Sequence, residues 1–204
     1  MQHYPQGTLY VVATPIGNLA DISLRALHVL GLVDAIACED TRHTQSLLRA
    51  YGIDKTSSQL IAVHQHNEAQ AAHTVMDHLR QGQRVAYVSD AGTPGISDPG
   101  ARLVAAVRQH QLRAIPLPGP SSVTTLLSVA GLVEDQPNGF VFLGFLATKA
   151  GEREREVLAL AAEHRAAVLL EAPHRIEALA LALATLGQRQ VTIGRALTKQ
   201  FEEA

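Results

Sequence analysis

Three loops rich in glycine and proline carry the residues best suited to binding a small ligand. They are residues 13–18 (ATPIGN), 89–100 (SDAGTPGISDPG) and 117–122 (LPGPSS), and each begins at the end of an apolar run. Glycine lets the backbone approach a ligand closely, and flanking hydroxyl and amide side chains offer hydrogen bonds. The second loop is richer than a turn requires, with three glycines and two prolines. We predict that Asp98 caps the helix that starts at Pro99, whereas Asp90 has no such structural explanation.

Two polar clusters end further apolar runs and supply acid–base groups. They are residues 39–43 (EDTRH) and 64–68 (HQHNE). Two histidines at positions 64 and 66 would share a face of a strand, which could suit a metal, but no third ligand has a suitable spacing. We therefore expect no metal and interpret these clusters as a polar wall for a substrate. The groups available for proton transfer are Asp40, His64, Glu68 and Asp90.

Motifs typical of other nucleotide chemistry are missing. The sequence has no G-x-x-x-x-G-K-[ST], no G-x-G-x-x-G opening the first helix and no G-x-S-x-G. A later cluster, residues 171–175 (EAPHR), follows another apolar run, and Thr198 and Lys199 follow the last one. The residues alone thus predict a cleft lined by glycine-rich loops, without fixing the reaction.

The elements that position these loops alternate between short strands and helices, which predicts an α/β fold with a largely parallel sheet. We expect the first helix at residues 22–30, capped by Asp21 and ended by Gly31, and a last strand at 190–194. A short strand is expected at 114–117, where the proline indicates either an edge position or a strand end. Prolines at 116, 118 and 120 predict a linker. The predicted domains are an N-terminal α/β domain (1–117) and a C-terminal α/β domain (118–204), and the abrupt end after a strand predicts that the second is incomplete.

The composition limits the classes of protein to which this chain can belong. The chain has 204 residues, of which 47% are hydrophobic, and a formal net charge of −2. This lacks the basic excess of many nucleic-acid-binding proteins, although a local basic patch would suffice. A single cysteine, Cys38, lies in an apolar run, so we expect a buried thiol in a reducing compartment. Without a signal-peptide pattern or a long apolar stretch, we expect a soluble cytoplasmic protein.

Taken together, the loops resemble the tetrapyrrole methylase fold family, and within it the group that methylates small-subunit ribosomal RNA. The matching runs cover nearly the whole chain in the family's order, and residues 88–100 are the most specific among them. The matching runs are residues 9–18, 39–44, 64–68, 88–100, 118–121, 171–175 and 197–199.

The resemblance implies two α/β domains with a cleft between them that binds S-adenosylmethionine in a folded conformation. The implied reaction is methyl transfer to the 2′-oxygen of a cytidine in 16S ribosomal RNA, by an enzyme that forms homodimers and acts on the assembled small subunit. The implied cofactor contacts are Ile16, Gly92, Gly95, Ser121, Ser122, Ala172 and Thr198. The candidate RNA contacts are Arg42, Arg102, Arg175 and Lys199.

Two departures and two alternatives stay open. The group usually has an acidic residue where Ala196 stands and Glu where Gln65 stands. One alternative is a methylase of a corrin or porphyrin ring on the same fold, which would need a broad apolar trough. The other is a non-catalytic binding module with an emptied cleft, against which the intact loop at 89–100 argues.

Overall fold

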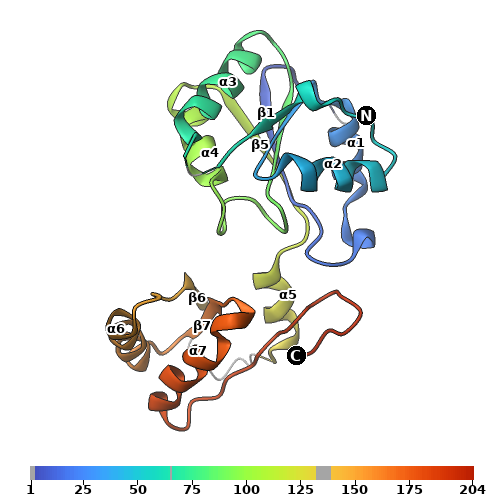
Figure 1. The fold of residues 1–204 in the computed structure, drawn as a ribbon. Helices are drawn as coiled ribbons and strands as arrows, with labels where there is room; N and C mark the ends of the chain where they lie inside the picture. The colour runs from blue at the N-terminus through green and yellow to red at the C-terminus, as the bar shows by residue number, and fades with distance from the viewer. Residues whose placement is uncertain (1–2, 65, 132–138) are drawn as a thin grey trace. The chain divides into compact units, whose positions relative to one another are not determined.

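A computed structural model of the chain describes residues 3–64, 66–131 and 139–204. The chain divides into two compact units, each described by itself below (Figure 1). The first unit comprises Met1–Thr124 together with Ala196–Glu202, and the second comprises Thr125–Arg195 with Glu203–Ala204. The boundary between them falls within helix α5 (Ser122–Val129).

The first unit is built on a parallel five-stranded sheet in the order β3-β2-β4-β1-β5. The strands are β1 (Thr8–Val12), β2 (Ala35–Cys38), β3 (Leu60–Ala62), β4 (Val85–Val88) and β5 (Arg113–Leu117). Every pairing in this sheet is parallel. The predicted α/β fold with a parallel sheet is confirmed, as is the edge position of β5, where Pro116 removes one amide donor.

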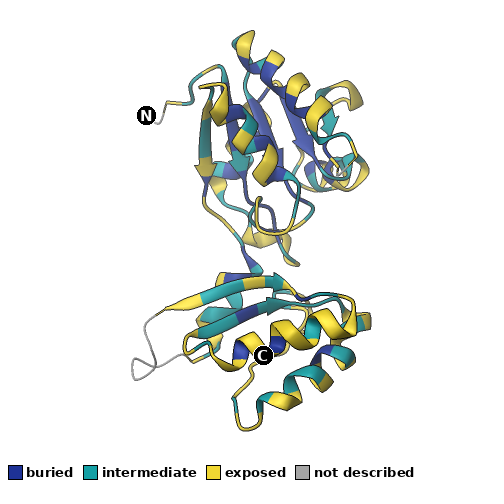
Figure 2. Cartoon of the chain, turned by 90° about the vertical axis from the view of Figure 1, so that its left-hand side faces the viewer, coloured by how far each residue is buried: buried dark blue, intermediate teal, exposed yellow. Residues whose placement is uncertain are grey.

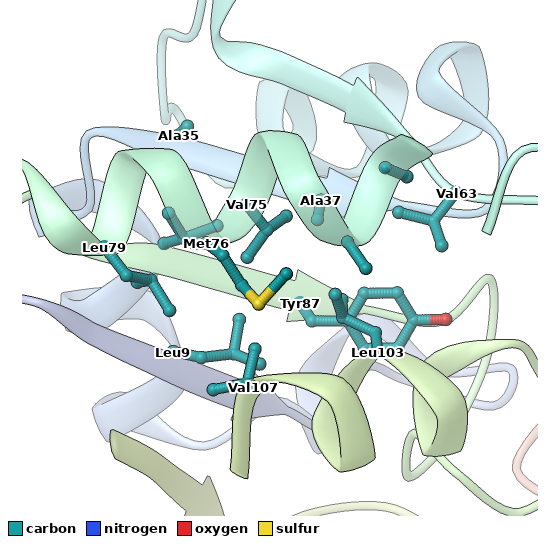
Figure 3. Close-up of a cluster of buried hydrophobic side chains, with 13 residues drawn as sticks. Leu9, Ala35, Ala37, Val63, Val75, Met76, Leu79, Tyr87, Leu103 and Val107 are labelled. Carbon is teal, nitrogen blue, oxygen red and sulfur yellow. The ribbon is translucent and has the colours of Figure 1, made fainter. Parts of the chain in front are cut away.

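Helices cover both faces of this sheet. They are α1 (Leu24–Leu32), α2 (Thr41–Ala50), α3 (Glu68–Arg80) and α4 (Gly100–Gln109). Side chains of α3 and α4, among them Met76 and Val107, pack with Leu9 on one face (Figure 3). Side chains of α1 and α2 form a second cluster on the other face. Covered on both sides, the inner strands β1, β2 and β4 are almost wholly buried (Figure 2), which explains their continuous apolar runs, whereas the edge strands β3 and β5 are more exposed.

The first helix differs from its prediction. Residues 19–21 form a short 3-10 turn, and α1 begins at Leu24 rather than at Ile22. The Ser23 hydroxyl accepts the amide of Ala26, and the Asn18 side chain accepts the amide of Ala20, so two caps replace the predicted Asp21 cap. Gly31 lies inside the helix instead of ending it.

One buried cation anchors the end of this helix. Lys55 is 8% exposed, and its ammonium donates to the carbonyl oxygens of Gly31, at 3.1 Å, and Val33, at 2.5 Å. Burial lowers the pKa of Lys55, and nearby Asp34 acts in the opposite direction. A cation is favourable at a helix C-terminus, where carbonyl groups lack partners in the helix.

The second unit is smaller. It holds a two-stranded parallel sheet of β6 (Phe140–Phe145) and β7 (Ala166–Leu170), with helices α6 (Ala150–Ala161) and α7 (Ile176–Leu183). Its core is a cluster of four buried side chains, Leu146, Val157, Leu160 and Leu179. Short 3-10 turns, Pro173–Arg175 and Ala184–Leu186, flank α7, so residues 173–186 form three helical segments in succession.

The last predicted strand is wrong. Residues 190–194 adopt no regular structure, and the alternating Val191 and Ile193 are each 58% exposed. Alternation of apolar residues makes a strand only where a neighbouring strand can pair with it. The chain instead forms one isolated antiparallel bridge between Arg195 and Glu203. No helix in the described parts of the chain is both long and apolar enough to cross a membrane.

Candidate functional site

Five loops gather at one edge of the first unit's sheet. Because all five strands are parallel, the segments that follow them lie at the same edge, where open α/β sheets bind ligands. The glycine-rich loops predicted to bind a ligand follow β1, β4 and β5, and the polar clusters follow β2 and β3. The fold therefore brings the predicted loops of this unit to a common edge.

The long loop after β4 is organised around Asp98. One oxygen of this carboxylate accepts the phenol of Tyr87 at 2.9 Å and the amide of Gly100 at 2.8 Å, and the other accepts the amide of Gly95 at 2.7 Å. Burial, together with the nearby Asp98 carboxylate, raises the pKa of Tyr87, so the phenol stays protonated and donates. Helix α4 begins only at Gly100, with Pro99 at its N-cap, so Asp98 holds the loop in place of the predicted capping role.

The loops after β1, β4 and β5 are hydrogen-bonded into one loop assembly (residues 13–18, 89–100 and 118–121). Thr14 and Gly92 exchange two backbone hydrogen bonds of 3.0 Å, and Gly92 has a φ of 83°. The Thr14 hydroxyl donates to the carbonyl of Ser89 at 3.1 Å. From the same long loop, Thr93 donates to the carbonyl of Pro120 at 2.9 Å.

This loop assembly leaves no room for larger residues at two of its glycines. A Cβ on Gly119 would lie 2.9 Å from the Cβ of Ala13. A Cβ on Gly92 would lie 3.3 Å from Ile16, and its positive φ already disfavours other residues. Both backbone hydrogen-bonding groups of Gly92, and the amide of Gly95, are used within the loops. These glycines therefore allow the segments of the loop assembly to approach one another closely.

The cluster after β2 is tied to the loop after β4 through Asp90. The Asp90 carboxylate accepts the amide of Asp40 at 3.2 Å, and the Asp90 carbonyl lies 3.1 Å from Nε2 of His43. Burial, the nearby Asp90 charge and the more distant Asp98 charge raise the pKa of Glu39. Asp90 thus has a structural role that its sequence position did not reveal.

Asp40 is the N-cap of α2. Its carboxylate accepts the amides of Arg42, at 2.8 Å, and His43, at 3.3 Å. These two hydrogen bonds lower the pKa of Asp40. The carboxylate is therefore a weak base that holds the first turn of the helix.

The cluster after β3 lies beyond the end of the strand. His64 and His66 follow β3, which ends at Ala62, and their ring centroids are 6.2 Å apart. Asn67 braces this turn by accepting the amide of His64 and donating to the carbonyl of Ala62. Glu68 forms an ion pair of 2.6 Å with Arg102 of α4. Gln65, one of the two departures from the family pattern, lies outside the described residues.

The four predicted RNA-binding residues differ in exposure and in their ion-pair partners, and they are divided between the two units. The Arg42 side chain is 91% exposed and approaches Asp40 at 3.6 Å, whereas Arg102 is paired with Glu68. Both belong to the first unit, as does Lys199. Arg175 belongs to the second unit, where it pairs with Glu171 at 3.1 Å and donates to the carbonyl of Leu146.

Six of the seven predicted cofactor residues belong to the first unit, and Ala172 belongs to the second. Thr198 lies beside the loop after β1, because a Cβ on Gly17 would be 2.7 Å from its hydroxyl oxygen. Thr198 has a φ of 67°, and its buried hydroxyl finds no hydrogen-bond partner among the described residues. Ser121 is buried before α5, which begins at Ser122. An unpartnered hydroxyl and a small-residue backbone fit a nucleoside ligand with several polar atoms.

No group of three or more His, Cys, Asp or Glu side chains in residues 3–64, 66–131 and 139–204 could hold a metal ion. Cys38 is buried as predicted, and burial raises its pKa to about 11. Its thiol is therefore not a nucleophile at neutral pH.

Known proteins share this fold. Residues 8–204 match the family described as Tetrapyrrole (Corrin/Porphyrin) Methylases. A solved cobalt precorrin-4 methyltransferase, CbiF, superposes on 99% of this chain and 87% of its own with a TM-score of 0.70 at 16% identity. A uroporphyrin-III C-methyltransferase from Thermus thermophilus, complexed with S-adenosyl homocysteine, covers 96% of this chain and 85% of its own with a TM-score of 0.64 at 17% identity. At these identities the likeness concerns the fold.

Relatives at higher identity carry one name, ribosomal RNA small subunit methyltransferase I. The relative from Escherichia coli O157:H7 is 49% identical over 97% of this chain and 68% of its own length. The relative from Vibrio cholerae serotype O1 is 50% identical over 95% of this chain and 66% of its own length. This chain therefore spans about two thirds of the length of these relatives. The family expected from the loops is confirmed: the chain belongs to the tetrapyrrole methylase family, in the group of ribosomal RNA small subunit methyltransferases I.

Proposed function

We propose that this protein transfers a methyl group from S-adenosylmethionine to small-subunit (16S) ribosomal RNA. The observation that carries the proposal is the identity of about half the residues, over 95–97% of the chain, with relatives of that name. The solved structure with S-adenosyl homocysteine, the demethylated form of this donor, supports the same cofactor.

The 2′-hydroxyl of a cytidine is the acceptor that we infer. The segments after β2 and β3 carry Asp40, His64 and Glu68, which can hydrogen-bond a ribose and its neighbours. A corrin or porphyrin ring would need a broad apolar surface there. The polar character of this edge therefore favours RNA over a macrocycle, although the solved structures that share the fold act on macrocycles.

The residues that we propose to hold the cofactor are Ile16, Gly92, Gly95, Ser121, Ser122, Ala172 and Thr198. When bound, S-adenosylmethionine supplies an electrophilic methyl group. The protein's contribution is chiefly to position the acceptor oxygen in line with that group. The loop assembly suits this task because its three segments are hydrogen-bonded to one another.

An RNA partner needs cations that can reach its phosphates. We propose that Arg42, Arg102, Arg175 and Lys199 contact phosphates, and that the substrate is the assembled small subunit in the cytoplasm. Arg42 supports this role best, since its side chain is 91% exposed. Affinity should then fall steeply with salt. We also propose that the protein acts as a homodimer, as its family resemblance implies, which sedimentation would test.

A methylation map of 16S ribosomal RNA tests the function. Cells that lack the gene should lose one 2′-O-methylcytidine, and the gene supplied in trans should restore it. An unchanged map would contradict the proposal. Calorimetry with S-adenosylmethionine separates an enzyme from a binding module with an emptied site, because the emptied module would release no heat.

A further inference from the structure

We propose that His43, in the first turn of α2, is the catalytic residue that accepts the proton of the RNA 2′-hydroxyl. The inference rests on the proposed function. It adds a residue that was not among the four acid–base candidates drawn from the sequence.

The orientation of the imidazole is the first argument. Nε2 of His43 lies 3.1 Å from the carbonyl oxygen of Asp90. A carbonyl oxygen can only accept a hydrogen bond, so Nε2 carries the ring proton of the neutral imidazole. Nδ1 is then left with its lone pair. No described residue hydrogen-bonds to Nδ1, and the side chain is exposed at the strand-end edge.

The second argument is that the three carboxylate candidates already have hydrogen-bond or ion-pair partners. The Asp40 carboxylate accepts two backbone amides and has a lowered pKa, so it attracts a proton weakly. Glu68 is held by Arg102 at 2.6 Å. The Asp90 carboxylate accepts the amide of Asp40 at 3.2 Å. Each of these carboxylates already has a partner that stabilises its charge, whereas His43 presents a neutral basic nitrogen.

The surroundings of His43 suit a nucleotide. The charged and titratable groups near it come from four elements. Arg42 and Asp40 belong to its own helix and cap, Glu39 and Asp90 follow β2 and β4, and His64 and His66 follow β3, which contacts α2. Arg42 precedes His43 and offers an exposed guanidinium for a phosphate next to the reacting ribose.

The step balances in atoms and charge. As the 2′-oxygen forms its bond to the methyl carbon, the O–H bond breaks and the proton moves to Nδ1. The carbon–sulfur bond breaks with its electron pair left on sulfur, which neutralises the sulfonium. The imidazolium that results is exposed, so it returns its proton to water. General base catalysis of this kind contributes about 100-fold to 10,000-fold to the rate.

Two substitutions separate proton transfer from structural support. His43→Gln keeps an amide donor near the position of Nε2, and so the hydrogen bond to Asp90, but has no basic nitrogen. His43→Ala removes both. We expect both variants to lose at least about 100-fold in kcat on small subunits, with heats of S-adenosylmethionine binding unchanged.

A matched control is available in the same unit. His110 is exposed and its Nδ1 lies 2.9 Å from the carbonyl of Ala106, so it is another carbonyl-bonded surface histidine. His110→Gln should keep full activity. Full activity of His43→Gln would overturn the proposal and leave His43 a structural link. A large loss in His64→Gln with none in His43→Gln would transfer the role to His64.

A readout without turnover keeps the two proposals distinct. Nitrogen-15 NMR of the full chain at neutral pH should show His43 protonated at Nε2 and unprotonated at Nδ1. A ring protonated at Nδ1 overturns the inference whatever the activity. Conversely, the wild-type protein could methylate no ribosomal RNA while the NMR result holds. The proposed function would then be wrong, and so would the assignment of the RNA 2′-hydroxyl as the source of the proton.

Discussion

At the scale of single residues, the strand-end edge concentrates negative charge in a partly buried setting. Glu39, Asp90 and Asp98 all follow β2 or β4, and Tyr87 delivers its phenol to the last of them. Most of these groups are held by amide or phenol donors, which compensates part of the cost of burial. Glu39 stands out because burial and the Asp90 charge raise its pKa.

This raised pKa makes the stability of the fold depend on pH through Glu39. In the window between its unfolded pKa, about 4.3, and its higher folded pKa, the folded state binds more protons, so stability falls as pH rises. Glu39→Gln removes this dependence with a side chain of nearly the same size and shape. We expect the variant to melt a few degrees higher than the wild type at pH 8 and at the same temperature near pH 4, as measured by calorimetry.

The exposed Glu154→Gln on α6 serves as the control for that comparison, and it should match the wild type at both pH values. If Glu39→Gln proved less stable than the wild type at pH 8, the carboxylate would be a net stabilising group, and the assigned cause of its raised pKa would be wrong.

At the scale of elements, the long loop after β4 depends on a glycine at the start of α4. A Cβ at position 100 would overlap the buried ring of Tyr87 and lie 2.6 Å from the Asp98 carboxylate. Tyr87 is fully buried and packed among core side chains (Figure 3), so its ring has little room to move away from an added methyl group. The clash therefore acts on the three hydrogen bonds through which Asp98 holds the loop.

We predict that Gly100→Ala destabilises the protein by about 1–3 kcal/mol and weakens S-adenosylmethionine binding. Gly31→Ala is the matched control, since Gly31 is a helical glycine with nothing within 4 Å of an added Cβ. That change should stabilise α1 by about 0.5–1 kcal/mol and leave binding unaffected. Denaturant unfolding and calorimetry measure both quantities. Equal stability of the two variants would show that the loop can accommodate the methyl group.

Much of this element-level structure follows from the sequence, for identifiable reasons. Strands such as β4 read as apolar runs because helices cover both faces of the sheet, and their parallel order brings the predicted loops together. The hydrogen bond between Tyr87 and Asp98 could not be predicted from the sequence. Tyr87 lies in an apolar run, so burial in the core was a sufficient explanation for its presence. Lys55 was missed likewise, since lysine is expected at the surface. The strand predicted at residues 190–194 was wrong because its alternating apolar residues have no neighbouring strand with which to pair.

At the scale of the whole molecule, the two units differ in how fully they bury their strands. All four residues of β4 are buried, whereas β6 has none buried and β7 only Val168. Large apolar side chains of the second unit remain exposed, including Phe145 at 50% and Leu181 at 77%. Local stability follows burial, so the second unit should open more readily.

Hydrogen exchange of the unliganded protein should therefore show amides of β6 and β7 exchanging at least about tenfold faster than those of β1 and β4. Mass spectrometry of peptides from the four strands makes this measurement. Uniform protection across both units would mean that they unfold as one cooperative body, against the difference expected from their cores.

The paired hydrogen bonds between Thr14 and Gly92 have a consequence for ligand affinity. Segments almost eighty residues apart in sequence are hydrogen-bonded together before any ligand binds. The entropy lost in aligning them is therefore part of the free energy of folding and does not reduce the free energy of binding. A nucleoside that docks against either segment therefore meets a surface that is already ordered, and a substitution that frees one segment should weaken the binding of that ligand.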